Sequence, residues 1–236
     1  MRQVASVGHY LATVDARGLQ FHQYASAHLD IALDGGRSVV LEMETRYPWD
    51  GQVKVTVADT DGAAWTLALR VPGWCTSVGV RVNGTVIEDG TAGGIYIALN
   101  RAWQPGDVVE LDLAMSPRLT APHPRVDATR GSLAIERGPM VYCLEGEDQE
   151  AGVDLLDVRL APDADLADVW RDDLLDGVVT VEAQGSVADV SDWDGTLYRS
   201  AMPPDDPTRP VKLTAVPYYA WANRSPGTMR VWIPQT

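Results

Sequence analysis

The stretch Arg130–Glu145, which reads RGSLAIERGPMVYCLE, decides the fold of this chain. Its apolar residues recur at every second position on both sides of Gly138-Pro139, and this period of two is typical of half-buried β-strands. Proline cannot donate a ladder hydrogen bond, and glycine allows a bend. We therefore predict two strand halves joined by a kink, at the point where the chain passes from one β-layer to the next.

Upstream of this stretch, short alternating segments separated by turn signals such as Asn83-Gly84 predict a β-sandwich. The predicted strands are Leu19–Tyr24, His28–Leu33, Val39–Thr45, Val53–Ala58, Trp65–Val71, Val78–Val82, Thr85–Glu88, Ile95–Leu99 and Val108–Met115. Three prolines within Pro117–Pro124 predict a domain boundary near residue 125.

Downstream of the boundary the pattern is looser. Predicted strands are Leu155–Leu160, Val178–Ala183, Lys212–Ala222 and Met229–Ile233. Leu166–Leu175 reads either as a short helix or as an exposed loop, and Ser186–Pro210 reads as a loop.

At the other end of the chain, the apolar spacing of Met1–Val14 predicts a short helix that ends at Asp15–Gly18. The expected architecture is all-β, with two consecutive β-sandwich, jelly-roll-like modules at residues 15–125 and 126–236 after a terminal helix at 1–14.

The chain has 236 residues and a net charge of −14, from 33 acidic and 19 basic residues. This excess of negative charge argues against nucleic-acid or anionic-membrane partners, whose phosphates would be repelled. No run of 18 apolar residues is long enough to span a membrane. Met1 is not followed by the charged and apolar regions of a signal peptide. We therefore expect a cytoplasmic protein.

Four motifs carry a family resemblance. They are Tyr47–Gly51 (YPWDG), Leu67–Trp74 (LALRVPGW), Gly131–Glu145 and Pro217–Arg224 (PYYAWANR). In this order they resemble the C-terminal β region of glycoside hydrolase family 127, the β-L-arabinofuranosidase group, and they span nearly the whole chain. The resemblance implies that the parent enzyme acts on L-arabinofuranosides.

The resemblance also implies that catalysis resides elsewhere. The family uses a zinc-bound cysteine as nucleophile and a glutamate as acid/base, on a helical (α/α) barrel upstream of the β region. The family's double-cysteine motif has no matching position here, so we expect no catalytic, cofactor-binding or metal-binding residue and no zinc in this chain. A segment similar to Met1–Val14 closes the family's barrel, so we expect Met1 to be an internal methionine and Met1–Val14 to expose an apolar patch.

Acids within the chain offer an alternative to this expectation, because retaining glycosidases use two carboxylates about 5 Å apart. The candidates are Glu42, Glu44, Glu136, Glu145, Asp192 and Asp194. Glu42 and Glu44 would share a strand face roughly 7 Å apart, which more often is a solvated face. Asp192-Trp193-Asp194 puts a ring between two acids but reads more simply as a turn.

The two cysteines, Cys75 and Cys143, lie in or beside apolar strands without metal-ligand spacing, and we expect neither a zinc site nor a disulfide. His9, His22, His28 and His123 are scattered, and His22 and Tyr24 are expected to share a strand face. The tryptophans at turns and strand ends could stack on sugars, but in a chain with one phenylalanine we expect them to fill core or interface space. They are Trp49, Trp74, Trp103, Trp193 and Trp221.

The sequence thus leaves three hypotheses. The first is a non-catalytic β region that supports the helical barrel of a family-127-like enzyme, with a homodimer and arabinose-containing glycans as further partners. The second is a free-standing carbohydrate-binding module, and the third is an autonomous glycosidase that uses acids of this chain.

Overall fold

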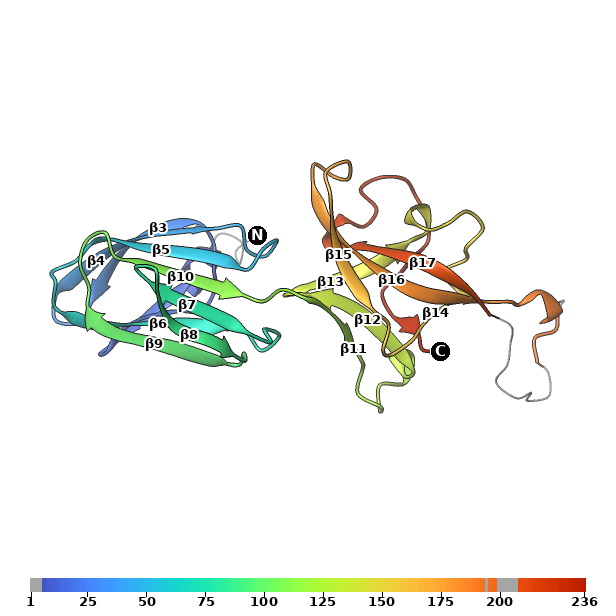
Figure 1. The fold of residues 1–236 in the computed structure, drawn as a ribbon, viewed down its shortest axis with the longest axis horizontal. Coiled ribbons are helices and arrows are strands. Elements are labelled where there is room, and N and C mark those ends of the chain that lie inside the picture. The colour runs from blue at the N-terminus through green and yellow to red at the C-terminus, as the bar shows by residue number, and fades with distance from the viewer. Residues whose placement is uncertain (1–5, 194, 199–207) are drawn as a thin grey trace. The chain divides into compact units, whose positions relative to one another are not determined.

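The computed structural model describes residues 6–193, 195–198 and 208–236 (Figure 1). Its regular elements are β-strands with a few single-turn 3-10 helices, which confirms the all-β prediction. The chain divides into two compact units, Met1–Met115 and Ser116–Thr236.

Over residues 6–115, the first unit holds ten strands and one 3-10 turn, η1 (Val7–Tyr10). The strands are β1 (Ala12–Asp15), β2 (Gly18–Phe21), β3 (Ala27–Leu33), β4 (Arg37–Thr45), β5 (Gln52–Asp59), β6 (Ala64–Val71), β7 (Val78–Val82), β8 (Thr85–Thr91), β9 (Ile95–Ala102) and β10 (Val108–Leu113). The predicted strands of this unit are therefore all present. Asn83 and Gly84 both have positive φ, as a type I′ hairpin turn between β7 and β8 requires.

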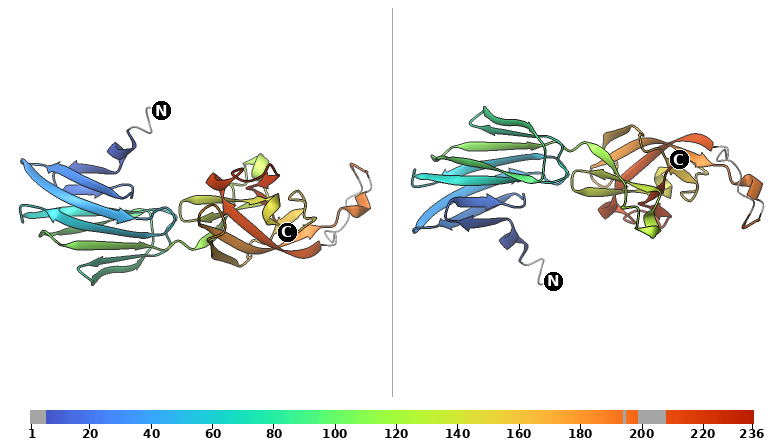
Figure 2. Two further views of the ribbon diagram at one scale, coloured as in Figure 1. Left: turned by 90° about the horizontal axis from the view of Figure 1, so that it is seen from above. Right: turned by 90° about the horizontal axis from the view of Figure 1, so that it is seen from below.

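Two sheets of the first unit share one core. The strand orders are β1-β2-β6-β9 and β3-β4-β5-β10-β7-β8, and Figure 2 shows the strands running roughly alongside one another. In β5 the even alternation buries Val53, Val55 and Val57 and leaves Lys54 exposed. Together with the large buried rings of Trp65 and Trp103, these residues form one continuous apolar cluster, which is the core of a β-sandwich.

The predicted helix over Met1–Val14 is wrong over the described residues. Residues 7–10 form only a 3-10 turn, and Ala12–Asp15 pair with β2 as an antiparallel strand. Ala12 packs on the core while Thr13 and Val14 stay outside, so the sheet edge decided the conformation. As expected, this segment exposes large apolar side chains, namely Val7, Tyr10 and Val14. Residues 1–5 lie outside the described part of the chain.

The second unit contains β11 (Pro117–Thr120), β12 (Ser132–Arg137), β13 (Met140–Glu145), β14 (Val158–Leu160), β15 (Leu166–Arg171), β16 (Val178–Ala188), β17 (Thr208–Pro217), β18 (Met229–Arg230) and β19 (Ile233–Pro234). Its 3-10 turns are η2 (Asp127–Thr129), η3 (Gly146–Asp148), η4 (Ser191–Trp193) and η5 (Tyr218–Ala220). The units divide between Met115 and Ser116 rather than near residue 125, because β11 of the proline-rich stretch pairs with β12.

The expected kink at Gly138-Pro139 is a chain reversal. Arg137 pairs with Met140 and Glu136 pairs with Val141, so β12 and β13 form a hairpin with a two-residue turn. Gly138 has φ of 56°, and proline fixes a negative φ at the next position. Positive φ at the first turn residue only is the requirement of a type II′ turn, which glycine meets without strain.

The strand ladder of the second unit closes on itself. Beyond the hairpin turn, the C-terminal segment enters between β12 and β13, with β19 pairing β12 and β18 pairing β13. Around the other side, β13 pairs β17, β17 pairs β16 and β16 pairs β14. A bridge from Leu160 to Gln235 completes the ring around a separate apolar core. The predicted strand at Met229–Ile233 is thus two short strands.

Two other expectations for this unit need correction. Leu166–Arg171 is neither helix nor loop but strand β15, paired with β16 over its whole length. It is an edge strand with mixed exposure, so its apolar alternation was weak. The predicted strand Lys212–Ala222 ends at Pro217, where η5 begins.

Candidate functional site

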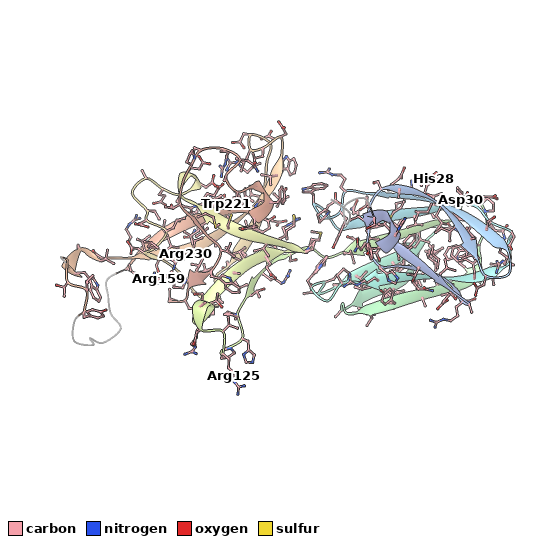
Figure 3. All side chains as sticks on the ribbon, turned by 180° about the vertical axis from the view of Figure 1, so that it is seen from behind. His28, Asp30, Arg125, Arg159, Trp221 and Arg230 are labelled. Carbon is pink, nitrogen blue, oxygen red and sulfur yellow. The ribbon has the colours of Figure 1, made fainter. Side chains whose placement is uncertain are left out.

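The loop that follows β17 is the most distinctive surface feature of the second unit. Tyr218 and Trp221 stack with their ring centroids 5.9 Å apart and an interplanar angle of 22°. Tyr218, Tyr219 and Trp221 are 45%, 55% and 41% exposed, although aromatic rings ordinarily bury large apolar area. Figure 3 marks the position of Trp221 in this unit. We refer to residues 218–224 as the aromatic loop.

Arg224 at the end of the aromatic loop is held by three carboxylates of β13 and η3. Its Nη1 and Nη2 atoms donate to Oδ1 and Oδ2 of Asp148 at 2.6 and 2.7 Å, a bidentate arrangement. Nη2 also donates to Glu145, which is 5% exposed. The Nε atom lies 2.8 Å from Glu147 Oε1 but out of line for a hydrogen bond.

The same acids fix the backbone of the loop. The amide of Ala222, a residue in the left-handed region with φ of 58°, donates to Glu145 Oε1 at 3.0 Å. The Nδ2 atom of Asn223 donates to the Ala220 carbonyl at 3.1 Å. Glu145 therefore bonds both the middle and the end of the loop, so the exposed rings are presented on a rigid backbone.

The electrostatics of this cluster favour a structural role. The hydrogen bonds that Arg224 donates to Asp148, and then the one it donates to Glu145, outweigh burial and raise the pKa of Arg224 above its ordinary value. Three carboxylates around one guanidinium leave a formal excess of two negative charges. With both Nη atoms engaged and its charge fixed, Arg224 is suited to positioning the loop rather than to proton transfer.

Most of the other predicted carboxylates lie in cross-strand pairs on solvated surfaces. Glu42 bonds His28 Nδ1 at 2.5 Å, and Glu44 bonds Lys54 at 3.0 Å, both on the outer face of the six-stranded sheet. His28 and Asp30 lie near each other on β3 in Figure 3. Glu136 accepts from Arg118 and, at 2.8 Å, from Thr120 on β11. These contacts do not bring two carboxylates together for hydrolysis.

The remaining candidates are dispersed. Trp193 is half-buried in η4, and Asp194 lies outside the described residues. His123 accepts from the Arg125 amide in a loop. His22 and Tyr24 do not share a face, because β2 ends at Phe21. Tyr24 turns into the core while His22 stays on the outer sheet face.

Cys75 and Cys143 are both free and buried, one in each unit. Burial raises the pKa of Cys75, and raises that of Cys143 to about 12. No group of three or more His, Cys, Asp or Glu side chains suited to a metal occurs among the described residues. The donor set of this part of the chain therefore does not fit the catalytic zinc that the family implies.

We expect both thiols to be unreactive in the native protein. The thiolate is the reactive form, and burial disfavours it at both positions. At pH 8, Ellman's reagent should label fewer than about 0.1 thiols per chain over minutes, against about two after unfolding in urea. Rapid labelling of either cysteine in the folded chain would contradict the buried placement.

The tryptophans divide between core and surface. Trp65 and Trp103 are buried, and Trp74 is half-buried against Tyr47. Trp49, Trp170 and Trp221 are exposed. Trp103 therefore fills core space as expected, whereas Trp49 and Trp221 lie outside the core, and for these two an interface position stays a prediction. Sequence reasoning missed the cluster around Arg224, because Arg224 lies 76 positions from Asp148 and 79 from Glu145 and nothing local links them.

Comparison with known proteins identifies the chain. Residues 18–115 match the family model for the β-L-arabinofuranosidase GH127 middle domain, and residues 117–234 match that for the glycoside hydrolase family 127 C-terminal domain. A non-reducing end β-L-arabinofuranosidase of Bifidobacterium longum subsp. longum is 35% identical over 98% of this chain. The chain spans 35% of that relative.

Solved structures agree. A GH127 β-L-arabinofuranosidase from Geobacillus stearothermophilus T6 is 39% identical, with a TM-score of 0.84 over the whole chain and 36% of its own length. A protein described as a glycoside hydrolase is 30% identical, with a TM-score of 0.88 over the whole chain and 38% of its own length. Among the described residues no helix is long and apolar enough to cross a membrane.

On the two family models and the relatives named above, the chain belongs to glycoside hydrolase family 127, of which it comprises the middle and C-terminal β domains.

Proposed function

We propose that this chain is a non-catalytic region of a β-L-arabinofuranosidase of family 127 and supports a helical catalytic barrel. The observation that carries the proposal is the aromatic loop, which presents three exposed rings on a backbone fixed by Arg224 and Glu145. Exposed rings with no further purpose would lower solubility, and a free surface loop needs no such anchor.

Rigid aromatic side chains are suited to a protein interface. Tyrosine, tryptophan and arginine are the residues most enriched at interface hot spots. Because the cluster already fixes the loop, little conformational entropy remains to be lost on docking. The exposed Val141 precedes Tyr142 on β13 and adds apolar surface, because Tyr142 pairs with Pro217, the residue directly before the loop.

The reactive groups belong, on this proposal, to the remainder of the enzyme. Both thiols here are buried with raised pKa. The candidate acids Glu42, Glu44, Glu136 and Glu145 are engaged in ion pairs. Zinc, the nucleophile and the acid/base are therefore assigned to the catalytic barrel. A cytoplasmic location and a homodimer remain predictions.

Association in trans tests the proposal. The chain is mixed with the separately produced N-terminal region of the Bifidobacterium longum relative and followed by analytical ultracentrifugation and by cleavage of an aryl β-L-arabinofuranoside. We expect no turnover by the chain alone and a one-to-one complex in the mixture. Trp221→Ala should weaken the complex about 30-fold, the effect of an average hot-spot residue.

Trp170→Ala is the matched control, because Trp170 is an exposed tryptophan on the edge strand β15 of the same unit. This variant should associate like the wild type. Turnover by the chain alone, or a complex equally insensitive to both substitutions, would refute the proposal.

A further inference from the structure

The outer face of the four-stranded sheet in the first unit is hollowed. The hollow has a volume of about 460 Å³ and lies over β2, β6 and β9. Its floor is made of Ala68 and Ala98, which are cross-strand partners, and Gln20 pairs with Ala68 on the other side. Two adjacent alanines surrounded by longer side chains leave room for a ligand on an otherwise regular sheet surface.

Tyr96 and His22 form one wall of the hollow. The hydroxyl of Tyr96 lies 2.6 Å from His22 Nδ1, and the two rings meet edge to face with centroids 5.7 Å apart. Tyr96 is 46% exposed, so part of its ring remains open to a ligand. The backbone of His22 is held by Arg70, whose Nη1 donates to its carbonyl.

Hydrogen bonds give this wall a fixed polarity. Gln20 Nε2 donates to the Gly18 carbonyl, which directs its Oε1 atom toward Thr13. The Thr13 hydroxyl donates to that oxygen at 3.0 Å and therefore accepts from His22 Nε2 at 2.7 Å. With Nε2 as the donor, Nδ1 is left to accept from the Tyr96 hydroxyl. This series of hydrogen bonds leaves the lone pairs of the Tyr96 hydroxyl and the second N–H of the Gln20 amide available to a ligand.

The opposite wall is also polar but carries no free cation. Arg17 pairs with Asp15 at 3.1 Å, and backbone donation from Arg17 lowers the pKa of Asp15. An anionic ligand would have to displace this pair. An apolar ligand would leave the polar walls unsatisfied, which costs free energy.

We propose that the hollow binds a neutral saccharide. Hydroxyl groups match the acceptors of Asp15 and Tyr96 and the N–H of Gln20, and the C–H face of a sugar ring matches the open tyrosine ring over the alanine floor. The choice of an arabinose-containing glycan rests on the proposed function, whereas the saccharide class rests on the hollow itself.

Calorimetric titration of the chain with short arabinan oligosaccharides tests the proposal. Tyr96→Ala should weaken binding at least tenfold, and Ala98→Arg, which fills the floor from an exposed position, should abolish it. Tyr198→Ala, at a 90% exposed tyrosine of the other unit, should bind like the wild type. Circular dichroism should show the same β signal for all four proteins.

Three outcomes would overturn the proposal. They are no saturable binding at about 10 mM oligosaccharide, binding that survives both substitutions in the hollow, and binding that depends on Trp221 instead. If Ala98→Arg blocks association with the catalytic region but leaves glycan binding intact, the hollow is a protein contact. Because the titration uses this chain alone, its failure leaves the supporting role of the aromatic loop untouched.

Discussion

Replacement of Arg224 by leucine is expected to lower the free energy of unfolding of the second unit by about 3–5 kcal/mol at pH 7. The substitution leaves Glu145, Glu147 and Asp148 together without their common cation. Glu145 is almost fully buried, so water cannot replace the guanidinium there. Urea unfolding followed by tryptophan fluorescence measures the loss.

The pH dependence separates lost charge from lost packing. Without the guanidinium, the clustered carboxylates favour protonation, so the native variant binds more protons than its unfolded chain. Its free energy of unfolding then rises relative to that of the wild type as the pH falls from 7 toward 4. A deficit that stays constant over this range would show that Arg224 acts through packing.

Arg171→Leu is the matched control in the same unit. Arg171 pairs with Asp173 on the surface, where both side chains are largely solvated. Exposed ion pairs contribute about 0–1 kcal/mol, so this variant should unfold close to the wild type. If both variants lose the same free energy of unfolding, the buried cluster around Arg224 contributes no more than an exposed ion pair, and the prediction is wrong.

The sequence predicted the first unit well because its strands alternate strictly. In β4, β5, β7 and β10 one face is buried and the other is polar, so period and burial agree. It failed where long-range pairing overrode local preference. Ala12–Asp15 became strand because β2 offered an edge, and Leu166–Arg171 because β16 did.

The candidate site could not be predicted from the sequence for the same physical reason, because it depends on long-range strand pairing. The PYYAWANR motif is evident in the sequence, but its partners Glu145 and Asp148 lie at the end of β13 and just after it, and only the pairing of β13 with β17 brings them beside the motif. The hollow likewise depends on a parallel pairing of β2 with β6, which places Gln20 beside Ala68 across 48 positions. Neither placement has a local signature in the chain.

Replacement of Trp103 by alanine is expected to destabilise the first unit by about 3–5 kcal/mol. Trp103 is fully buried against Trp65, with ring centroids 5.6 Å apart, and its Nε1 donates to the Trp65 carbonyl at 3.0 Å. The alanine variant loses the buried ring area, leaves a cavity between the sheets and leaves that carbonyl without its donor. Trp103→Phe keeps part of the ring and should lose less.

Amide hydrogen exchange with mass spectrometry assigns the loss to a unit. Each unit has its own apolar cluster, so Trp103→Ala should speed exchange in peptides from Met1–Met115, and Arg224→Leu in peptides from Ser116–Thr236. Trp49→Ala, at an exposed tryptophan of the first unit, should change the free energy of unfolding of neither unit by more than about 0.5 kcal/mol. If Trp103→Ala speeds exchange equally throughout the chain, the two units unfold as one, and the local cores do not set their stability separately.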